Sequence, residues 1–152
     1  MKLAEALQER ADLNKKIAQL RSRLVMNATV QEGEKTAENP QELLKELNSC
    51  LENLQSLIGA INITNCKTIV KGKSLTELIA NKDCLTLKIQ SYRELLDAAS
   101  RLAQRATRTE IKIESAIDVQ KYQNELDQMS KELRILDNTI QELNWTTLLI
   151  TQ

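Results

Sequence analysis

Four long segments of the chain carry apolar side chains at alternating intervals of three and four residues, and this spacing constrains the fold most strongly. Because an α-helix turns once in about 3.6 residues, such spacing places the apolar side chains on one helix face. The 152-residue sequence contains three glycines and one proline, so little in it interrupts long helices. We predict helices over residues 2–26, 40–65, 74–106 and 118–144, and a helix content above about two thirds.

The apolar stripes of the four segments differ in width and regularity. The last segment has the most regular heptad pattern, unbroken from Val119 to Leu143, whereas the face of the second is wide enough for a bundle interior. Arg10 and Lys82 interrupt the stripes of the first and third segments. Each of these cations either extends its charged head to water along an apolar stem or pairs with a carboxylate and fixes the register.

Capping residues mark the starts of three predicted helices. Asn39 precedes Pro40, Asp118 opens the last segment, and Ser74 opens a capping box that Glu77 completes. These side chains satisfy backbone N–H groups that a helix start leaves without partners. The helix starts are therefore predicted independently of the apolar stripes.

The connections between the helices contain short alternating patterns that are typical of strands. They cover Met26–Gln31, Lys67–Lys71 and Glu110–Ser115, and we expect the first and third to pair at one end of the molecule. The polar stretch Glu32–Asn39 is predicted to be an exposed loop. We predict a mainly α fold: an antiparallel four-helix bundle or coiled-coil arrangement with short β segments in the connections, forming one domain over residues 1–152.

Charge and composition narrow the classes of partner. The chain has 21 basic and 21 acidic side chains, and its aromatic residues are one tryptophan and two tyrosines. A neutral chain with so few aromatic rings does not favour nucleic-acid binding. We find no leader and no apolar run near the ~18–20 residues that span a bilayer, so we expect a cytoplasmic protein, with membrane contact left open.

The sequence predicts no catalytic, cofactor or metal site. Histidine is absent, and the three cysteines form no CxxC pair. We interpret Cys50 and Cys84 as small apolar fillers and Cys66, placed in a connection, as an exposed thiol. We therefore expect a protein that is not an enzyme.

Two groups of residues are candidates for partner contact. Arg101, Arg105 and Arg108 have no carboxylate among them, so they either bind an anion or form a basic last turn that complements the helix dipole. Trp145 is either a partner or membrane anchor or a side chain that closes the end of the bundle.

Pieces of sequence spread over nearly the whole chain carry a likeness to a known family. They are Leu3–Leu7, Glu9–Leu13, Asn27, Ala28, Val30–Gly33, Ile61, Asn62, Thr64, Asn65, Leu75, Thr76, Asp83, Tyr92, Arg93, Asp118, Val119, Ile140, Gln141, Asn144 and Trp145. The Gln31–Gly33 and Asn144–Trp145 pieces are the more specific ones. On these residues the sequence resembles the septicolysin-like family of small bacterial helical proteins. The resemblance implies a pore-forming cytolysin, and it carries no catalytic or binding residue over to this chain.

Our first functional prediction is a non-enzymatic, self-associating helical-bundle protein of the septicolysin-like family. The unbroken stripe of the last helix and the additional leucines Leu87, Leu95 and Leu102 of the third exceed what one inward face requires. The alternative for these leucines is a wider core face within a monomer. The alternative functions are a pore-forming or membrane-active cytolysin and, third, a small enzyme without a recognisable site.

Overall fold

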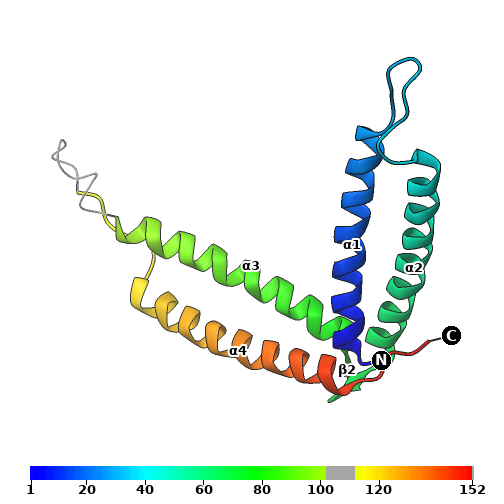
Figure 1. Ribbon diagram of the computed structural model, residues 1–152. Coiled ribbons are helices and arrows are strands. Elements are labelled where there is room, and N and C mark those ends of the chain that lie inside the picture. Colours follow the sequence, from blue (N-terminus) through cyan, green and yellow to red (C-terminus); the bar gives the residue numbers. More distant parts are fainter. Residues whose placement is uncertain (102–111, 152) are drawn as a thin grey trace. The chain divides into compact units, whose positions relative to one another are not determined.

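The computed structural model describes residues 1–101 and 112–151. Four helices hold 75% of these residues, which confirms the predicted mainly α fold: α1 (Leu3–Met26), α2 (Pro40–Lys67), α3 (Leu75–Ser100) and α4 (Val119–Thr146) (Figure 1). The chain divides into two compact units, Met1–Ser74 with Leu143–Gln152, and Leu75–Glu142. The assignment of residues 1–152 to a single domain stays a prediction.

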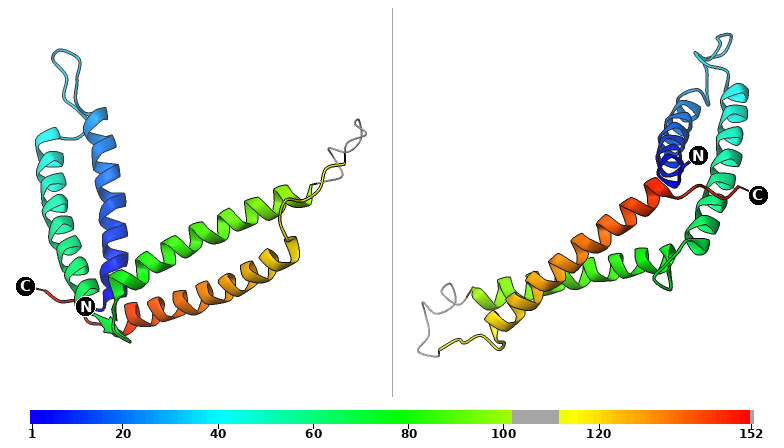
Figure 2. Two further views of the ribbon diagram at one scale, coloured as in Figure 1. Left: turned by 180° about the vertical axis from the view of Figure 1, so that it is seen from behind. Right: turned by 90° about the horizontal axis from the view of Figure 1, so that it is seen from below.

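The first unit is built on a hairpin of α1 and α2, which lie side by side in Figures 1 and 2. Leu3, Ala6, Ile17 and Leu20 of the predicted stripe of α1 are buried, because amphipathic periodicity fixes which helix face can leave water. Leu20 is fully buried, and an exposed Lys16–Glu46 ion pair of 2.8 Å links the two helices beside the core. The core residues are Ile17, Leu20, Leu43 and Cys50, with Leu13, Leu24, Leu47 and Leu54 packed around them.

The loop between α1 and α2 is held by the buried side chain of Asn27. Its amide nitrogen donates to the Arg23 carbonyl oxygen (2.8 Å), and its amide oxygen accepts from the Glu38 N–H (2.9 Å). Arg23 also pairs with the Glu38 carboxylate, and this hydrogen bond holds the pKa of Glu38 below its usual range. The predicted strand over Met26–Gln31 is wrong: Met26 is still helical, and the rest of the segment follows the loop that these contacts fix.

A two-stranded hairpin follows α2. Strands β1 (Ile69–Val70) and β2 (Lys73–Ser74) are antiparallel, with Ile69 opposite Ser74. Lys71 and Gly72 both have positive φ, as a two-residue type I′ turn requires. The strand predicted within Lys67–Lys71 is therefore confirmed over two residues, and its partner is the segment immediately after the turn.

The C-terminal segment returns to the start of the chain and completes the first unit. Lys2 and Leu148 form an antiparallel β-bridge, flanked by a hydrogen bond from the Leu149 N–H to the Met1 carbonyl oxygen (3.0 Å). Thr64 of α2, which is fully buried, accepts from the Ile150 N–H at 2.9 Å. The tail thus ties the beginning of α1 to the end of α2.

The second unit is a hairpin of α3 and α4. The Tyr92 and Tyr122 rings meet edge to face at 6.0 Å within its core. The core residues are Ile89, Leu96, Leu126 and Met129, with Leu85, Tyr92, Ile117, Val119, Tyr122 and Leu133 packed around them. The stripe of the last helix is therefore packed within this hairpin from Val119 to Leu133. Of the additional leucines predicted on the third helix, Leu87 and Leu95 are 64% and 45% exposed.

The start of α4 agrees with the prediction, whereas the end of α3 and the predicted strand after it differ from the prediction. Asp118 caps α4, as predicted, by accepting from the Lys121 N–H (3.1 Å). The helix α3 ends at Ser100, earlier than the predicted residue 106, and residues 102–106 lie outside the described residues. The predicted strand over Glu110–Ser115 is not formed in its described part, Lys112–Ser115, and its first two residues lie outside the described residues.

Candidate functional site

The outer face of α2 carries apolar side chains that its hairpin with α1 does not cover. Leu44, Leu51 and Ile58 recur every seven residues and are 47%, 44% and 38% exposed. The sequence pattern predicts a bundle interior for the whole wide face of this helix, whereas only its inner part is buried, at Leu43, Cys50 and Ile61. The three exposed residues form the outer stripe of α2.

Amide side chains separate the apolar residues of the outer stripe. Asn48, Gln55 and Asn62 are exposed and lie four residues after Leu44, Leu51 and Ile58, in the three-and-four spacing of a helix-packing seam. From Asn53 to Cys66 the helix has no charged side chain. Depletion of charge is the compositional mark of interface cores, whereas free helix surfaces carry many charges.

A shallow hollow lies beside the C-terminal half of the outer stripe. It measures about 370 Å³ and is lined by Gln55, Ser56, Gly59, Ala60, Ile63 and Thr151. A Cβ atom at Gly59 would meet no atom of the described chain within 4 Å. The internal packing therefore does not require glycine here, although glycine in a helix interior costs about 1 kcal/mol relative to alanine.

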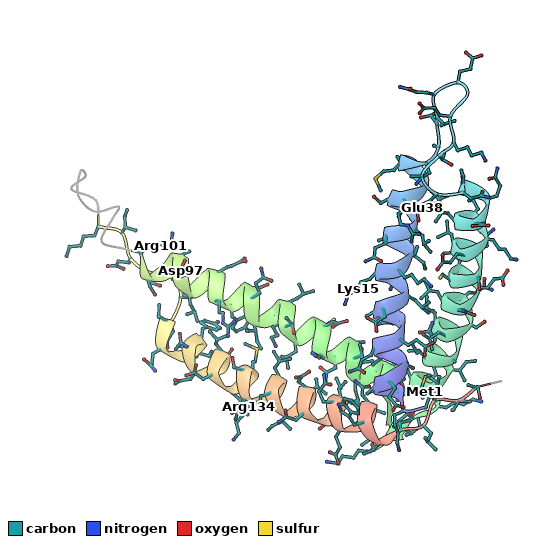
Figure 3. All side chains as sticks on the ribbon, in the orientation of Figure 1. Met1, Lys15, Glu38, Asp97, Arg101 and Arg134 are labelled. Atoms are coloured by element: carbon teal, nitrogen blue, oxygen red, sulfur yellow. The ribbon has the colours of Figure 1, made fainter. Side chains whose placement is uncertain are left out.

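The three candidate arginines are only partly described. Arg101 pairs with the Asp97 carboxylate one turn earlier, and both side chains are exposed at the end of α3 (Figure 3). Its charge is therefore offset by its own helix. Arg105 and Arg108 lie outside the described residues, so the predicted anion site stays a prediction.

Trp145, Cys50 and Cys66 lie in the first unit, and Cys84 lies in α3. Trp145 is 55% exposed, so it is available to a partner and closes a core only in part. Cys50 is buried as an apolar filler and Cys66 is exposed, both as predicted, although Cys66 lies in the last turn of α2 instead of a connection. Cys84 is exposed, so its interpretation as a filler is wrong.

Lys82 on α3 pairs with Asp137 on α4. Its ammonium donates to the Asp137 carboxylate, and this hydrogen bond holds the pKa of Asp137 below its usual range. Of the two interpretations for a cation within an apolar stripe, pairing with a carboxylate thus holds for Lys82. The residue at this stripe position links the two helices of the hairpin at a defined register.

Neither a metal-binding cluster nor a membrane-spanning helix is found within the described residues. Over residues 1–101 and 112–151, no group of three or more Cys, Asp or Glu side chains is placed to hold a metal ion. In the same part of the chain, no helix combines the length and the apolar character that crossing a membrane requires.

Comparison with known proteins identifies the family. Residues 10–149 match the model of a family of unknown function, DUF6847. The chain belongs to this family. The crystal structure of a functionally unknown conserved protein from Corynebacterium diphtheriae is similar to the DUF6847 chain over 99% of both chains, with 36% sequence identity and a TM-score of 0.89.

The comparisons extend no further toward an activity. No curated protein matches this DUF6847 member. The septicolysin-like resemblance is not tested by either match and stays a prediction. Sequence reasoning recognised the wide face of α2 but missed the outer stripe as a separate surface, although the uncharged stretch from Asn53 to Cys66 was a readable signal.

Proposed function

We propose that this DUF6847 member is a non-enzymatic, self-associating helical protein in which the outer stripe of α2 packs on a second copy of the chain. The observation that carries this proposal is the exposed, heptad-spaced and largely uncharged face around Leu51 and Ile58. Exposure of such an apolar face to water is unfavourable, and packing it against another helix lowers the free energy.

The pattern of the outer stripe favours a helix as the partner. Three-and-four spacing matches the ridges of another helix, and amides between apolar layers select a register because an unpaired buried amide is costly. The hollow at Gly59 would admit a side chain of the partner or a close approach of its backbone.

A second copy is the occupant that the charges favour. The chain has zero net charge, so two copies experience little long-range repulsion, and from Asn53 to Cys66 α2 offers no charge for a strongly acidic or basic partner. Homo-oligomers with two-fold symmetry bring identical surfaces together, which allows one uncharged stripe to cover another.

The mass in solution tests the proposal. Light scattering across micromolar concentrations in moderate salt is expected to give a mass that is a multiple of 17.3 kDa. A mass of 17.3 kDa at every concentration would overturn self-association.

Substitutions on α2 and α4 test the surface. Leu51→Glu combined with Ile58→Glu places charges in the outer stripe and is expected to give the monomer mass, because a buried unpaired carboxylate is costly. Gly59→Leu tests the same surface by filling the hollow. Ile135→Glu, on α4 at 54% exposure, is the matched control and is expected to keep the wild-type mass. Loss of association in the control alone would move the interface away from α2.

Vesicle leakage separates this proposal from the cytolytic function that the septicolysin-like resemblance implies. We expect purified protein to leave dye-loaded phosphatidylcholine–phosphatidylglycerol vesicles intact at concentrations where it self-associates. Rapid dye release that depends on the outer stripe would instead favour a pore-forming protein.

A further inference from the structure

A groove runs along one flank of the α3–α4 hairpin. It measures about 560 Å³, within the range of small-molecule sites. Ile89, which is 3% exposed, and the half-buried Leu133 contribute apolar surface to it. The polar residues that line the groove are Lys82, Thr86, Gln90 and Arg93 of α3, and Ser130, Arg134 and Asp137 of α4.

Two of the charged side chains that line the groove are guanidinium groups without a carboxylate partner in the described part of the chain. Lys82 is neutralised by Asp137, as described above. Arg93 and Arg134 come from the two different helices, and the described part of the chain shows no hydrogen bond or ion pair for either. Figure 3 shows Arg134 projecting from α4. The groove therefore has an excess of two positive charges in a chain whose net charge is zero.

The helices themselves explain why these two arginines stay unpaired. Asp97 stands four residues after Arg93, at helical pairing distance, but it pairs with Arg101. Asp137 stands three residues after Arg134, but it pairs with Lys82. On each helix, the carboxylate that follows the arginine at helical pairing distance is thus paired with another cation.

The neutral polar side chains of the groove already donate hydrogen bonds to other groups of the chain. The Thr86 hydroxyl donates to the Lys82 carbonyl oxygen (2.8 Å), and the Ser130 hydroxyl donates to the Leu126 carbonyl oxygen (2.9 Å). The Gln90 amide nitrogen donates to the Glu94 carboxylate at 3.1 Å. The guanidinium groups are therefore the strong donors that remain for a ligand.

We infer that this groove binds a phosphate monoester that carries an apolar group, with its phosphate between Arg93 and Arg134 and its apolar group against Ile89 and Leu133. A guanidinium forms two parallel hydrogen bonds to an oxyanion, and a phosphate monoester has enough oxygens for two such groups at once. A monocarboxylate has a single charge and two oxygens, so it binds two guanidinium groups less strongly, and inorganic phosphate leaves the apolar surface in water. The inference does not depend on self-association.

Phenyl phosphate is the probe that tests the inference. In an NMR titration of the full chain at constant ionic strength, it is expected to shift the amides of Thr86, Gln90 and Ser130 in a saturable manner. Binding should be at least about tenfold tighter than that of benzoate or of inorganic phosphate. Equal affinity for benzoate would overturn the role of two guanidiniums, and equal affinity for inorganic phosphate would overturn the role of the apolar surface.

Charge-matched variants localise the binding. Arg93→Gln combined with Arg134→Gln removes both donors from exposed positions and is expected to weaken phenyl phosphate binding by about a hundredfold. Arg21→Gln combined with Arg10→Gln, on α1, removes the same charge and is expected to leave the affinity unchanged. An equal loss in both double variants would show binding through net charge alone and would overturn the site, as would the absence of saturable shifts up to about 10 mM probe.

Discussion

The hydroxyl of Thr64 offers a direct measurement of how strongly the C-terminal tail is held. It accepts from the Ile150 N–H (2.9 Å) and donates to the Ala60 carbonyl oxygen (2.8 Å), and the side chain is fully buried. Thr64→Val keeps the shape but removes the acceptor. A buried N–H that loses its acceptor destabilises the fold by about 1–3 kcal/mol. Because Ile150 is only half-buried, water can reach its N–H, so the destabilisation should lie in the lower part of this range. We therefore expect a loss of about 1–2 kcal/mol in unfolding free energy.

Urea denaturation followed by circular dichroism measures this loss, and amide hydrogen exchange at Ile150 localises it. Thr64→Ser is the matched control, because it keeps the acceptor and loses one buried methyl at a cost of about 1 kcal/mol. Both variants are expected to be destabilised, but only Thr64→Val should lose protection of the Ile150 amide. Unchanged protection in Thr64→Val would refute the assignment of this hydrogen bond as the anchor of the tail.

Three further predictions address the cores, the loop and the pH dependence. Leu20→Ala is expected to cost about 2–5 kcal/mol in urea denaturation because it opens a cavity in the first unit, whereas Leu87→Ala at an exposed position should stay within about 0.5 kcal/mol. Asn27→Ala should cost about 1–3 kcal/mol and accelerate amide exchange in the loop that follows α1, and unchanged exchange there would contradict its role. Because the pKa of Asp137 is lowered in the folded protein, its ion pair contributes stability that is fully present above the ordinary pKa of 3.8. This contribution is lost as the pH falls through the lowered pKa. The melting temperature of Asp137→Asn should therefore decrease less between neutral and strongly acidic pH than that of the wild type. An equal decrease in both would remove this pair from the acid response.

Local signals predicted the helices well, because both periodicity and capping act over one or two turns. Asn39 accepts from the Gln41 N–H (3.0 Å), as its place before Pro40 predicts. Leu20 and Leu126 are buried, as their stripe positions predict. The alternation in Met26–Gln31 misled the strand prediction, because six alternating residues are a weak signal compared with the continuation of a helix and the contacts of a loop.

Contacts between distant segments could not be predicted from such patterns. The pairing of Lys82 with Asp137 joins residues 55 positions apart, and the β-bridge of Lys2 joins it to a residue near the other end of the chain. Each depends on a register that only the packed hairpin or the returning tail defines. The groove of the α3–α4 hairpin was missed for the same reason, because which side chains line it depends on how the two helices pack. The outer stripe of α2, in contrast, had a local signal in the uncharged stretch from Asn53 to Cys66.

The β-bridge between Lys2 and Leu148 sets the order in which a ribosome can complete this protein. The first unit contains the earliest and the latest residues of the described chain, while Leu75–Glu142 is synthesised between them. The hairpin of α1 and α2 has its helices synthesised early, yet the segment that donates to Thr64 follows α4. During translation, the end of α2 therefore lacks this hydrogen-bond partner until the whole second hairpin has been synthesised and Ile150 has left the exit tunnel.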